Sequence, residues 1–224
     1  MLLSKDKKIF IYLFLLIFLG SINNKNFIDN RIFEIKNLKV HGLNQNEKIK
    51  LLIQLEQIKN QNIFFLPKKE IIEILNSENL IESFLINKNY PSNLKIIVKK
   101  TSFLANMNVK DENFLVGSNK KLIKSEYIDP NLPIVFGTPP INEFFLIKND
   151  ILNSPIKLND VKKFYFFPSK RWDIELINGV LIKLPSDKSI EALNNYFDVK
   201  NLSQFDNVKI FDMRIDKQII INEL

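Results

Sequence analysis

An uncharged apolar run near the amino terminus constrains the fold more than any other feature. Residues Ile9 to Ile22 read IFIYLFLLIFLGSI, and no charged residue lies between Lys8 and Lys25. These fourteen residues would form a helix about 21 Å long, shorter than the roughly 30 Å hydrocarbon core of a bilayer. The flanking lysines can extend toward the headgroups, and two asparagines follow the run. We therefore predict a single transmembrane anchor over residues 9–24.

The residues on either side of this run predict its orientation. Lys5, Lys7 and Lys8 precede it, so the positive-inside rule predicts a cytoplasmic tail over residues 1–8, with the rest of the chain on the outer side. A cleaved signal peptide has an apolar core of similar length, and a buried core helix is a further alternative. We favour the anchor because the segment LGSI does not match an A-x-A cleavage pattern. In a bacterium, the bulk of the chain would be periplasmic.

The composition excludes several classes of protein. Among 224 residues there is no cysteine and one histidine, His41. Disulfides, thiolate metal sites and cysteine nucleophiles are excluded, and one imidazole cannot supply a two-histidine metal site. The acidic residues Asp111, Glu112 and Asp160 have no spacing that would pair two carboxylates for glycan hydrolysis. The net charge of +7 is spread along the chain and does not indicate nucleic-acid binding. We expect no catalytic site, no metal site and no cofactor.

Residues 31–100 are predicted to form a small unit of helices and strands. The segment 32–40 has strand character, and two amphipathic helices follow, the second opened by Pro67. Strands are expected over 80–88 and 94–99, which gives the order βααββ with both helices on one face of a three-stranded sheet. The core-facing residues are expected to be Leu51, Leu55 and Ile58 in the first helix, Ile71, Ile74 and Leu75 in the second, and Leu94, Ile96 and Val98 in the last strand.

Residues 101–224 are dominated by strand patterns, with helices predicted over 141–152 and near 189–197. The Asn178-Gly179 turn fixes the register of one hairpin, because a three-residue loop over 177–179 places apolar residues opposite one another on one face. Such a loop requires Gly179 in the left-handed conformation. The expected pairs are Leu176–Val180, Ile174–Ile182 and Trp172–Leu184.

The last residues are predicted to form a second hairpin. A loop over 216–218 would pair Ile215 with Ile219 and Met213 with Ile221, so that these four residues and Phe211 face the core. We expect the last strand to lie uncovered at an edge of its sheet, where it can pair with another chain. The predicted fold class is therefore α+β, with one transmembrane helix, a βααββ unit, and a mostly antiparallel β unit with flanking helices.

Six short motifs follow one another across residues 40–214. They are Val40-His41-Gly42, Asn62-Ile63-Phe64, Tyr90-Pro91-Ser92-Asn93-Leu94, Leu132-Pro133-Ile134-Val135-Phe136-Gly137, Arg171-Trp172-Asp173-Ile174 with Asn178-Gly179, and Phe211-Asp212-Met213-Arg214. In order and spacing they resemble the FtsQ family of bacterial cell-division proteins, called DivIB in Gram-positive bacteria. Two departures stand out. Lys100-Thr101-Ser102-Phe103 replaces the family's acidic-basic-x-Pro linker, which implies a less rigid linker, and Ile215 replaces an aromatic residue.

The resemblance implies a non-enzymatic, single-pass inner-membrane scaffold of the divisome, with a POTRA domain over 31–100 and a β domain over 101–224. In this family the β domain binds FtsB by strand addition, FtsL joins through FtsB, and the POTRA domain helps recruit the protein to the septum through other partners. No nucleic acid and no small-molecule substrate is implied. The alternative is a membrane-anchored periplasmic carrier of lipid or lipopolysaccharide, which would need a continuous apolar groove. The candidate partner-binding residues are Arg171, Arg214, Ile215, Ile219, Ile220 and Ile221.

Overall fold

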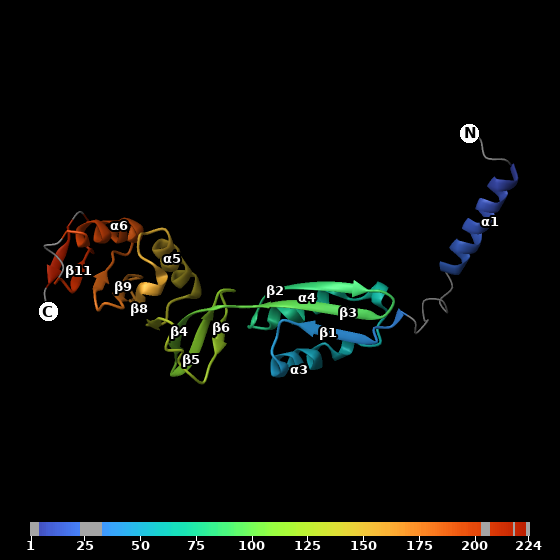
Figure 1. Cartoon of the computed structure of the whole chain (residues 1–224), viewed down its shortest axis with the longest axis horizontal. Helices are drawn as coiled ribbons and strands as arrows, with labels where there is room; N and C mark the ends of the chain where they lie inside the picture. The colour runs from blue at the N-terminus through green and yellow to red at the C-terminus, as the bar shows by residue number, and fades with distance from the viewer. Residues whose placement is uncertain (1–4, 23–32, 203–206, 217, 223–224) are drawn as a thin grey trace. The chain divides into compact units, whose positions relative to one another are not determined.

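The structure, a computed structural model, describes residues 5–22, 33–202, 207–216 and 218–222. The chain divides into two compact units, Met1–Lys100 (unit 1) and Thr101–Leu224 (unit 2). Unit 1 contains helix α1 (Lys5–Ile22) (Figure 1). Its apolar side chains from Ile9 to Leu19 are all exposed. Within the described ranges, no helix combines the length and apolarity needed to cross a membrane. Asn23, Asn24 and Lys25 lie outside the described residues.

The remainder of unit 1 packs two helices against a three-stranded sheet. The elements are β1 (Asn37–His41), α3 (Gln45–Gln54), the 3-10 helices η2 (Glu56–Ile58) and η3 (Ile63–Phe65), α4 (Lys68–Ser77), β2 (Ile81–Asn89) and β3 (Asn93–Lys100). The sheet order is β1-β3-β2, with β1 parallel and β2 antiparallel to β3. The predicted order βααββ is confirmed. The first strand begins later than predicted, because Glu34 forms an isolated bridge with Asn62 instead of extending β1.

The core of unit 1 follows the apolar spacing of the sequence. The predicted core residues Leu51, Leu55, Ile58, Ile71, Leu75, Leu94, Ile96 and Val98 are buried, and Ile74 packs against them. Gly42 ends β1 with φ of +97°, and a Cβ atom there would lie 1.8 Å from the carbonyl oxygen of Val98. Only glycine fits this close approach to β3, which explains the residue that ends the first motif.

Unit 2 is built on a nine-stranded mixed sheet in the order β12-β11-β10-β9-β8-β7-β4-β5-β6. Five neighbouring pairs are antiparallel and three, β4–β7, β7–β8 and β10–β11, are parallel. The strands are β4 (Phe103–Val109), β5 (Glu112–Gly117), β6 (Leu122–Lys124), β7 (Ile134–Phe136), β8 (Val161–Phe166), β9 (Trp172–Leu176), β10 (Leu181–Lys183), β11 (Ile210–Asp212) and β12 (Ile220–Asn222).

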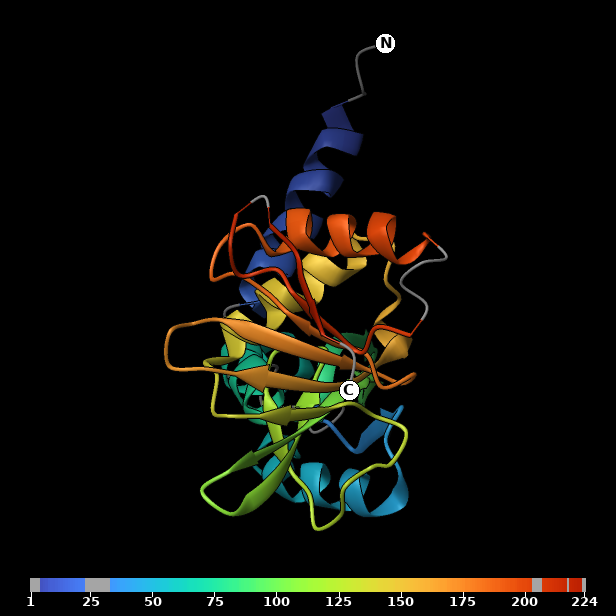
Figure 2. The same ribbon diagram turned by 90° about the vertical axis from the view of Figure 1, so that its left-hand side faces the viewer.

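Two helices, α5 (Ile141–Leu152) and α6 (Ser189–Lys200), cover one face of this sheet (Figure 2). The helix predicted over 141–152 is confirmed, and the helix predicted near 189–197 extends three residues further. A row of buried side chains crosses the covered face from Met107 in β4 to Phe211 in β11. The helices close this core with Phe144, Ile147, Ile151, Ala192, Leu193 and Tyr196.

The β9–β10 hairpin has the predicted register. Ile182 pairs with Ile174, the Leu176 N–H donates to the Val180 carbonyl at 2.8 Å, and Gly179 has φ of +84°. All three predicted pairs contribute side chains to the core. The apolar alternation and the left-handed glycine together specified this hairpin.

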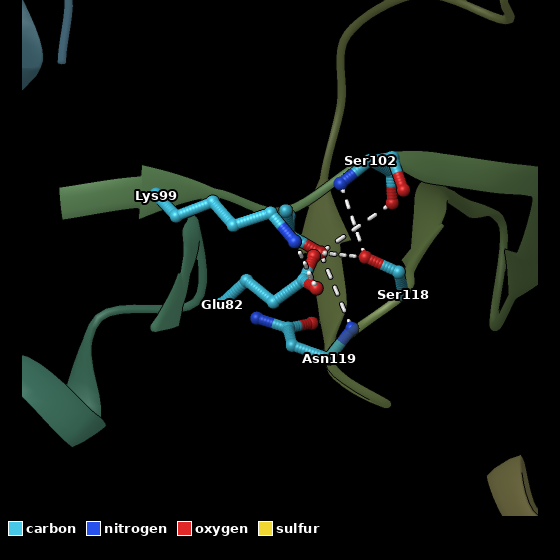
Figure 3. A network of polar contacts seen from close by, with 6 residues as sticks. Glu82, Lys99, Ser102, Ser118 and Asn119 are labelled. Carbon is cyan, nitrogen blue, oxygen red and sulfur yellow. Dashed lines mark hydrogen bonds and ion pairs between the residues drawn. The ribbon is translucent and has the colours of Figure 1, made fainter. Parts of the chain in front are cut away.

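The first residues of unit 2 are tied to the turn between β5 and β6. Thr101 is buried, its hydroxyl lies 3.0 Å from the Ser118 hydroxyl, and it accepts a hydrogen bond from the Asn119 N–H at 3.2 Å. The Ser102 N–H donates to the same Ser118 hydroxyl at 3.1 Å (Figure 3). The Thr101-Ser102 segment, which replaces the family's usual linker motif, is thus held by side-chain hydrogen bonds within unit 2.

Candidate partner-binding edge

The strand β12 ends the large sheet. It pairs in antiparallel register with β11, with Ile210 opposite Asn222, Phe211 opposite Ile221 and Asp212 opposite Ile220. On its other side no further strand pairs with it among the described residues. The last described strand therefore forms an edge of the sheet, where an added strand can pair.

The predicted register of this hairpin was wrong by two residues. Ile221 faces Phe211 and not Met213, and Ile215 lies in the loop with an exposed side chain instead of pairing with Ile219. The strand ends early because the Asp212 carboxylate accepts a hydrogen bond from the backbone N–H of Arg214 at 3.2 Å, a local bond that competes with strand pairing. A shift of two residues keeps every side chain on its face, so the apolar pattern could not detect it.

The backbone of β12 can be oriented from a hydrogen bond of β11. The Met213 N–H donates to the Lys183 carbonyl in β10 at 2.9 Å. Backbone groups of successive strand residues point alternately to the two sides, so residues 211 and 213 face β10, and residues 210 and 212 face β12. Their partners Asn222 and Ile220 face back toward β11. Ile221, between them, directs its N–H and C=O to the free side.

Apolar side chains line this edge. Ile220 is 47% exposed and Ile221 is 37% exposed, although Ile221 belongs to the row that is otherwise buried under the helices. Ile215 is 51% exposed, while Ile219 is half-buried and packs against the core. The edge therefore offers outward backbone groups together with uncovered isoleucines, the two features that strand addition uses.

Arg214 follows β11 and is paired within the chain. Its guanidinium Nε donates to Asp212 Oδ1 at 2.7 Å, and a second guanidinium nitrogen contacts the other carboxylate oxygen. These hydrogen bonds lower the pKa of Asp212 below its ordinary value. The Arg214 side chain remains 42% exposed, so a carboxylate from another chain can still reach it.

Arg171 is held more firmly than Arg214. Its Nε donates to Asp173 at 3.2 Å, its guanidinium lies over the Phe167 ring at 4.2 Å, and its side chain is 23% exposed. Burial raises the pKa of Asp173, although Arg171, Lys183 and Arg214 act in the opposite direction. We infer that Arg171 mainly positions the turn before β9.

Sequence reasoning missed a charged row on the face opposite the helices. Asp173 pairs with Lys183, Lys183 with Asp212, and Asp212 with Ile220, so the row leads across four strands to the edge. The parallel pairing of β10 with β11 brings these residues together, and the local sequence pattern does not predict that pairing. Beside the edge, a depression of about 270 Å³ lies between the start of α6 and the β11–β12 loop, and Arg214 and Ile215 line it.

The C-terminal unit matches a known family of bacterial cell-division proteins. The family model described as cell division protein FtsQ/DivIB, C-terminal, matches residues 105–214. This range contains β9, β10 and β11 and ends at Arg214. The chain belongs to the FtsQ/DivIB family.

Curated relatives agree with this assignment. The chain is 25% identical over 186 residues to the cell division protein FtsQ of Rickettsia bellii, which covers 81% of this chain and 69% of that protein. It is 26% identical over 187 residues to FtsQ of Rickettsia typhi, covering 81% and 70%. It is 21% identical over 194 residues to FtsQ of Rhizobium meliloti, covering 84% of this chain and 62% of that protein.

Among solved structures, the chain is similar to the major extracytoplasmic domain of the trans isomer of the bacterial cell division protein DivIB from Geobacillus stearothermophilus. The match has 11% sequence identity and a TM-score of 0.35, and it covers 47% of this chain and 96% of that chain. At this score the likeness adds nothing to the family assignment.

Proposed function

We propose that this chain is a non-enzymatic, single-pass inner-membrane scaffold of the divisome. It recruits and links cell-division proteins, and it helps control septal peptidoglycan synthesis. The periplasmic segment of FtsB adds a strand to β12, and FtsL joins through FtsB. The observation that carries the proposal is the edge itself, where Ile221 turns its N–H and C=O outward beside the exposed Ile220.

Charge supports the same partner contact. Arg214 is exposed at the start of the loop between β11 and β12, and its present partner, Asp212, belongs to this chain. A partner carboxylate would complete a charge-assisted hydrogen bond at the edge. Ile215 and Ile219 flank this position and would pack against the partner's apolar side chains.

The membrane anchor is supported by the side chains of α1. Its apolar residues are exposed all round the helix, and a helix that is apolar on every face requires an apolar surrounding. Unit 1 from residue 31 to residue 100 has the βααββ order of a POTRA domain, and we assign it that role in recruitment to the septum.

The rival function, a periplasmic lipid carrier, needs a continuous apolar groove. Aromatic rings from both layers fill the space between the large sheet and its two helices, and Phe144, Phe164 and Tyr196 are fully buried there. Two depressions of unit 2 have volumes of about 400 and 390 Å³, and polar as well as apolar side chains line both. These observations favour the scaffold.

Titration calorimetry tests the proposal, using residues 26–224 and the periplasmic segment of the FtsB from the same organism. Ile221→Pro removes the outward N–H and should weaken binding at least about tenfold, since proline cannot donate to a new ladder. Ile221→Ala keeps the N–H and is the matched control for the lost side chain. Ile220→Pro should instead loosen the β11–β12 pairing, because its N–H faces β11.

Each variant must keep the far-UV circular dichroism of the wild type before its binding is compared. Binding that survives Ile221→Pro unchanged would remove the edge from the proposal. Absence of binding by the folded wild-type protein would contradict the proposal as a whole and favour the carrier.

A further inference from the structure

An exposed aromatic cluster lies at the end of unit 1 where the described chain resumes after α1. The Phe64 ring stacks on the Tyr90 ring at 4.8 Å and meets the Phe33 ring edge-on at 5.0 Å. Phe64 and Tyr90, whose rings are in contact, are 52% and 55% exposed, and Phe65, which follows Phe64 in η3, is 68% exposed. Rings that contact one another and still face solvent form a patch that the core of unit 1 does not use.

The segments that carry these rings meet at one end of the small sheet. Asn37 at the start of β1 pairs with Asn93 at the start of β3, and Asn93 also pairs with Asn89 at the end of β2. The Lys36 N–H donates to the Ser92 carbonyl at 2.9 Å, which joins the segment before β1 to the β2–β3 turn. The cluster is thus built from three parts of the chain and is not a single protruding loop.

Three lysines lie near the cluster. The Lys88 ammonium donates to the Ile63 carbonyl at 2.6 Å, directly before the two phenylalanines. Burial and the nearby charge of Lys68 lower the pKa of Lys88, so at least two ammonium groups lie close together here. Lys36, directly before β1, is exposed.

Two carboxylates lie beside these lysines in the sequence: Glu34, which is half-buried, and Glu70, which is exposed in the first turn of α4. The local net charge is positive, with Lys36, Lys68 and Lys88 against these two carboxylates, and it complements an anionic surface.

The length of the chain limits how far this patch can be from α1. Ten residues, 23–32, connect α1 to Phe33. Fully extended, they span at most about 35 Å. A membrane that holds α1 is then within reach of the cluster.

We propose that Phe64, Phe65 and Tyr90 dock unit 1 onto the surface of an anionic lipid bilayer, with Lys36 and Lys68 contacting the headgroups. Aromatic rings favour the interfacial region of a bilayer, and adjacent cations bind its anionic headgroups. The proposal rests on the anchoring of α1 under the proposed function. Docking would hold residues 33–100 at the surface of the membrane that anchors the chain.

Site-directed spin labelling of the full chain tests this docking. The chain has no cysteine, so single-cysteine variants need no background substitution. The chain is placed in nanodiscs of phosphatidylcholine with phosphatidylglycerol, and the accessibility of each label to lipid-soluble oxygen is compared with that to a water-soluble nickel chelate. The label positions are Phe65→Cys in the cluster, Leu15→Cys in α1 and Ser83→Cys as the control.

Ser83 is the matched control because it is exposed and lies six residues before Asn89 in β2, about 20 Å from the cluster end of the sheet. We expect the oxygen-to-nickel ratio at residue 65 to exceed that at residue 83. In the Phe65→Cys background, Lys36→Gln and Lys68→Gln should each lower the ratio of docked to undocked chain about fivefold. In nanodiscs of phosphatidylcholine alone, the excess at residue 65 should be lost.

The three labels separate the two proposals. A lipid-exposed label at Leu15 with equal ratios at residues 65 and 83 would overturn the docking and leave the anchor standing. A water-exposed label at Leu15 would overturn the anchor, and the docking with it. A ratio at residue 65 that is high but unchanged in uncharged nanodiscs would overturn the role assigned to the lysines.

Discussion

The hydroxyl of Tyr196 provides a sharp test of how unit 2 is stabilised. Tyr196 is 1% exposed, and its hydroxyl has no hydrogen-bond partner among the described residues. A buried polar group that lost its water and gained no partner costs free energy. Tyr196→Phe removes the hydroxyl and keeps the ring, which packs edge-on against Phe211 at 4.9 Å. We expect the variant to be more stable than the wild type by about 1 kcal/mol at pH 8.

The same hydroxyl makes stability depend on alkaline pH. Burial raises the pKa of Tyr196 to about 12, from an ordinary value of 10.0. Because the folded pKa lies above the unfolded one, the folded state binds the proton more tightly, and its stability falls as the pH rises above about 10. At pH 11 the loss is about 1.4 kcal/mol, because this pH lies about one unit above the pKa of the unfolded hydroxyl and below that of the folded one. Tyr196→Phe should lack this part of the loss.

Urea denaturation at pH 8 and pH 11, followed by the fluorescence of Trp172, measures both effects. Trp172 is the single tryptophan of the chain and is buried in unit 2, so it reports that unit alone. Tyr165→Phe is the matched control, because its hydroxyl donates to Glu175 at 2.7 Å and its removal should destabilise unit 2 by about 1 kcal/mol. A Tyr196→Phe variant that is less stable than the wild type at pH 8 would refute the reasoning.

Four further substitutions have expected outcomes. Gly42→Ala should destabilise unit 1 by about 3 kcal/mol in thermal melts, because the added Cβ would clash with β3. Gly179 also has a positive φ, but an added Cβ would have no atom within 4 Å, so Gly179→Ala should cost about 1 kcal/mol. Arg214 lowers the pKa of Asp212, so the ionised carboxylate stabilises the folded state, and this stability is lost as Asp212 is protonated below about pH 4. Arg214→Gln should therefore show a smaller decrease in stability at acid pH than the wild type. Urea midpoints from pH 3 to pH 6 measure the difference. Thr101→Val should lower the stability of unit 2 by about 1 kcal/mol, because its hydroxyl loses its hydrogen bonds with Ser102, Ser118 and Asn119. Trp172 fluorescence measures the change.

The two hairpins of unit 2 show what the sequence could determine. In the β9–β10 hairpin, a one-residue slip would expose the apolar face, and Gly179 permits the left-handed turn, so one register remained. In the β11–β12 hairpin, a two-residue slip leaves the faces unchanged and the loop holds no glycine. The decisive contact was instead the hydrogen bond from the Arg214 N–H to Asp212, which depends on a side-chain rotamer.

The local sequence pattern predicted one part of the candidate site and not the other. Ile220 and Ile221 were recognised because an apolar strand follows a turn near the end of the sequence. The charged row through Lys183 was not, because it arises where β10 and β11 run parallel after the α6 crossover. The partners of strands separated by a helix are decided by how that helix packs, and local patterns carry no information about it.

The shortness of β12 has a consequence for the lifetime of any complex formed there. Of its three residues, Ile221 alone turns backbone groups outward, so the described edge can offer an incoming strand two hydrogen bonds. At about 1 kcal/mol each, two such bonds correspond to a gain in affinity of roughly thirtyfold. For any partner strand bound there, the side chains around the edge must therefore supply most of the affinity and all of the specificity. Under the proposed function, a partner strand joined by so few backbone hydrogen bonds would dissociate faster than one paired along a long strand.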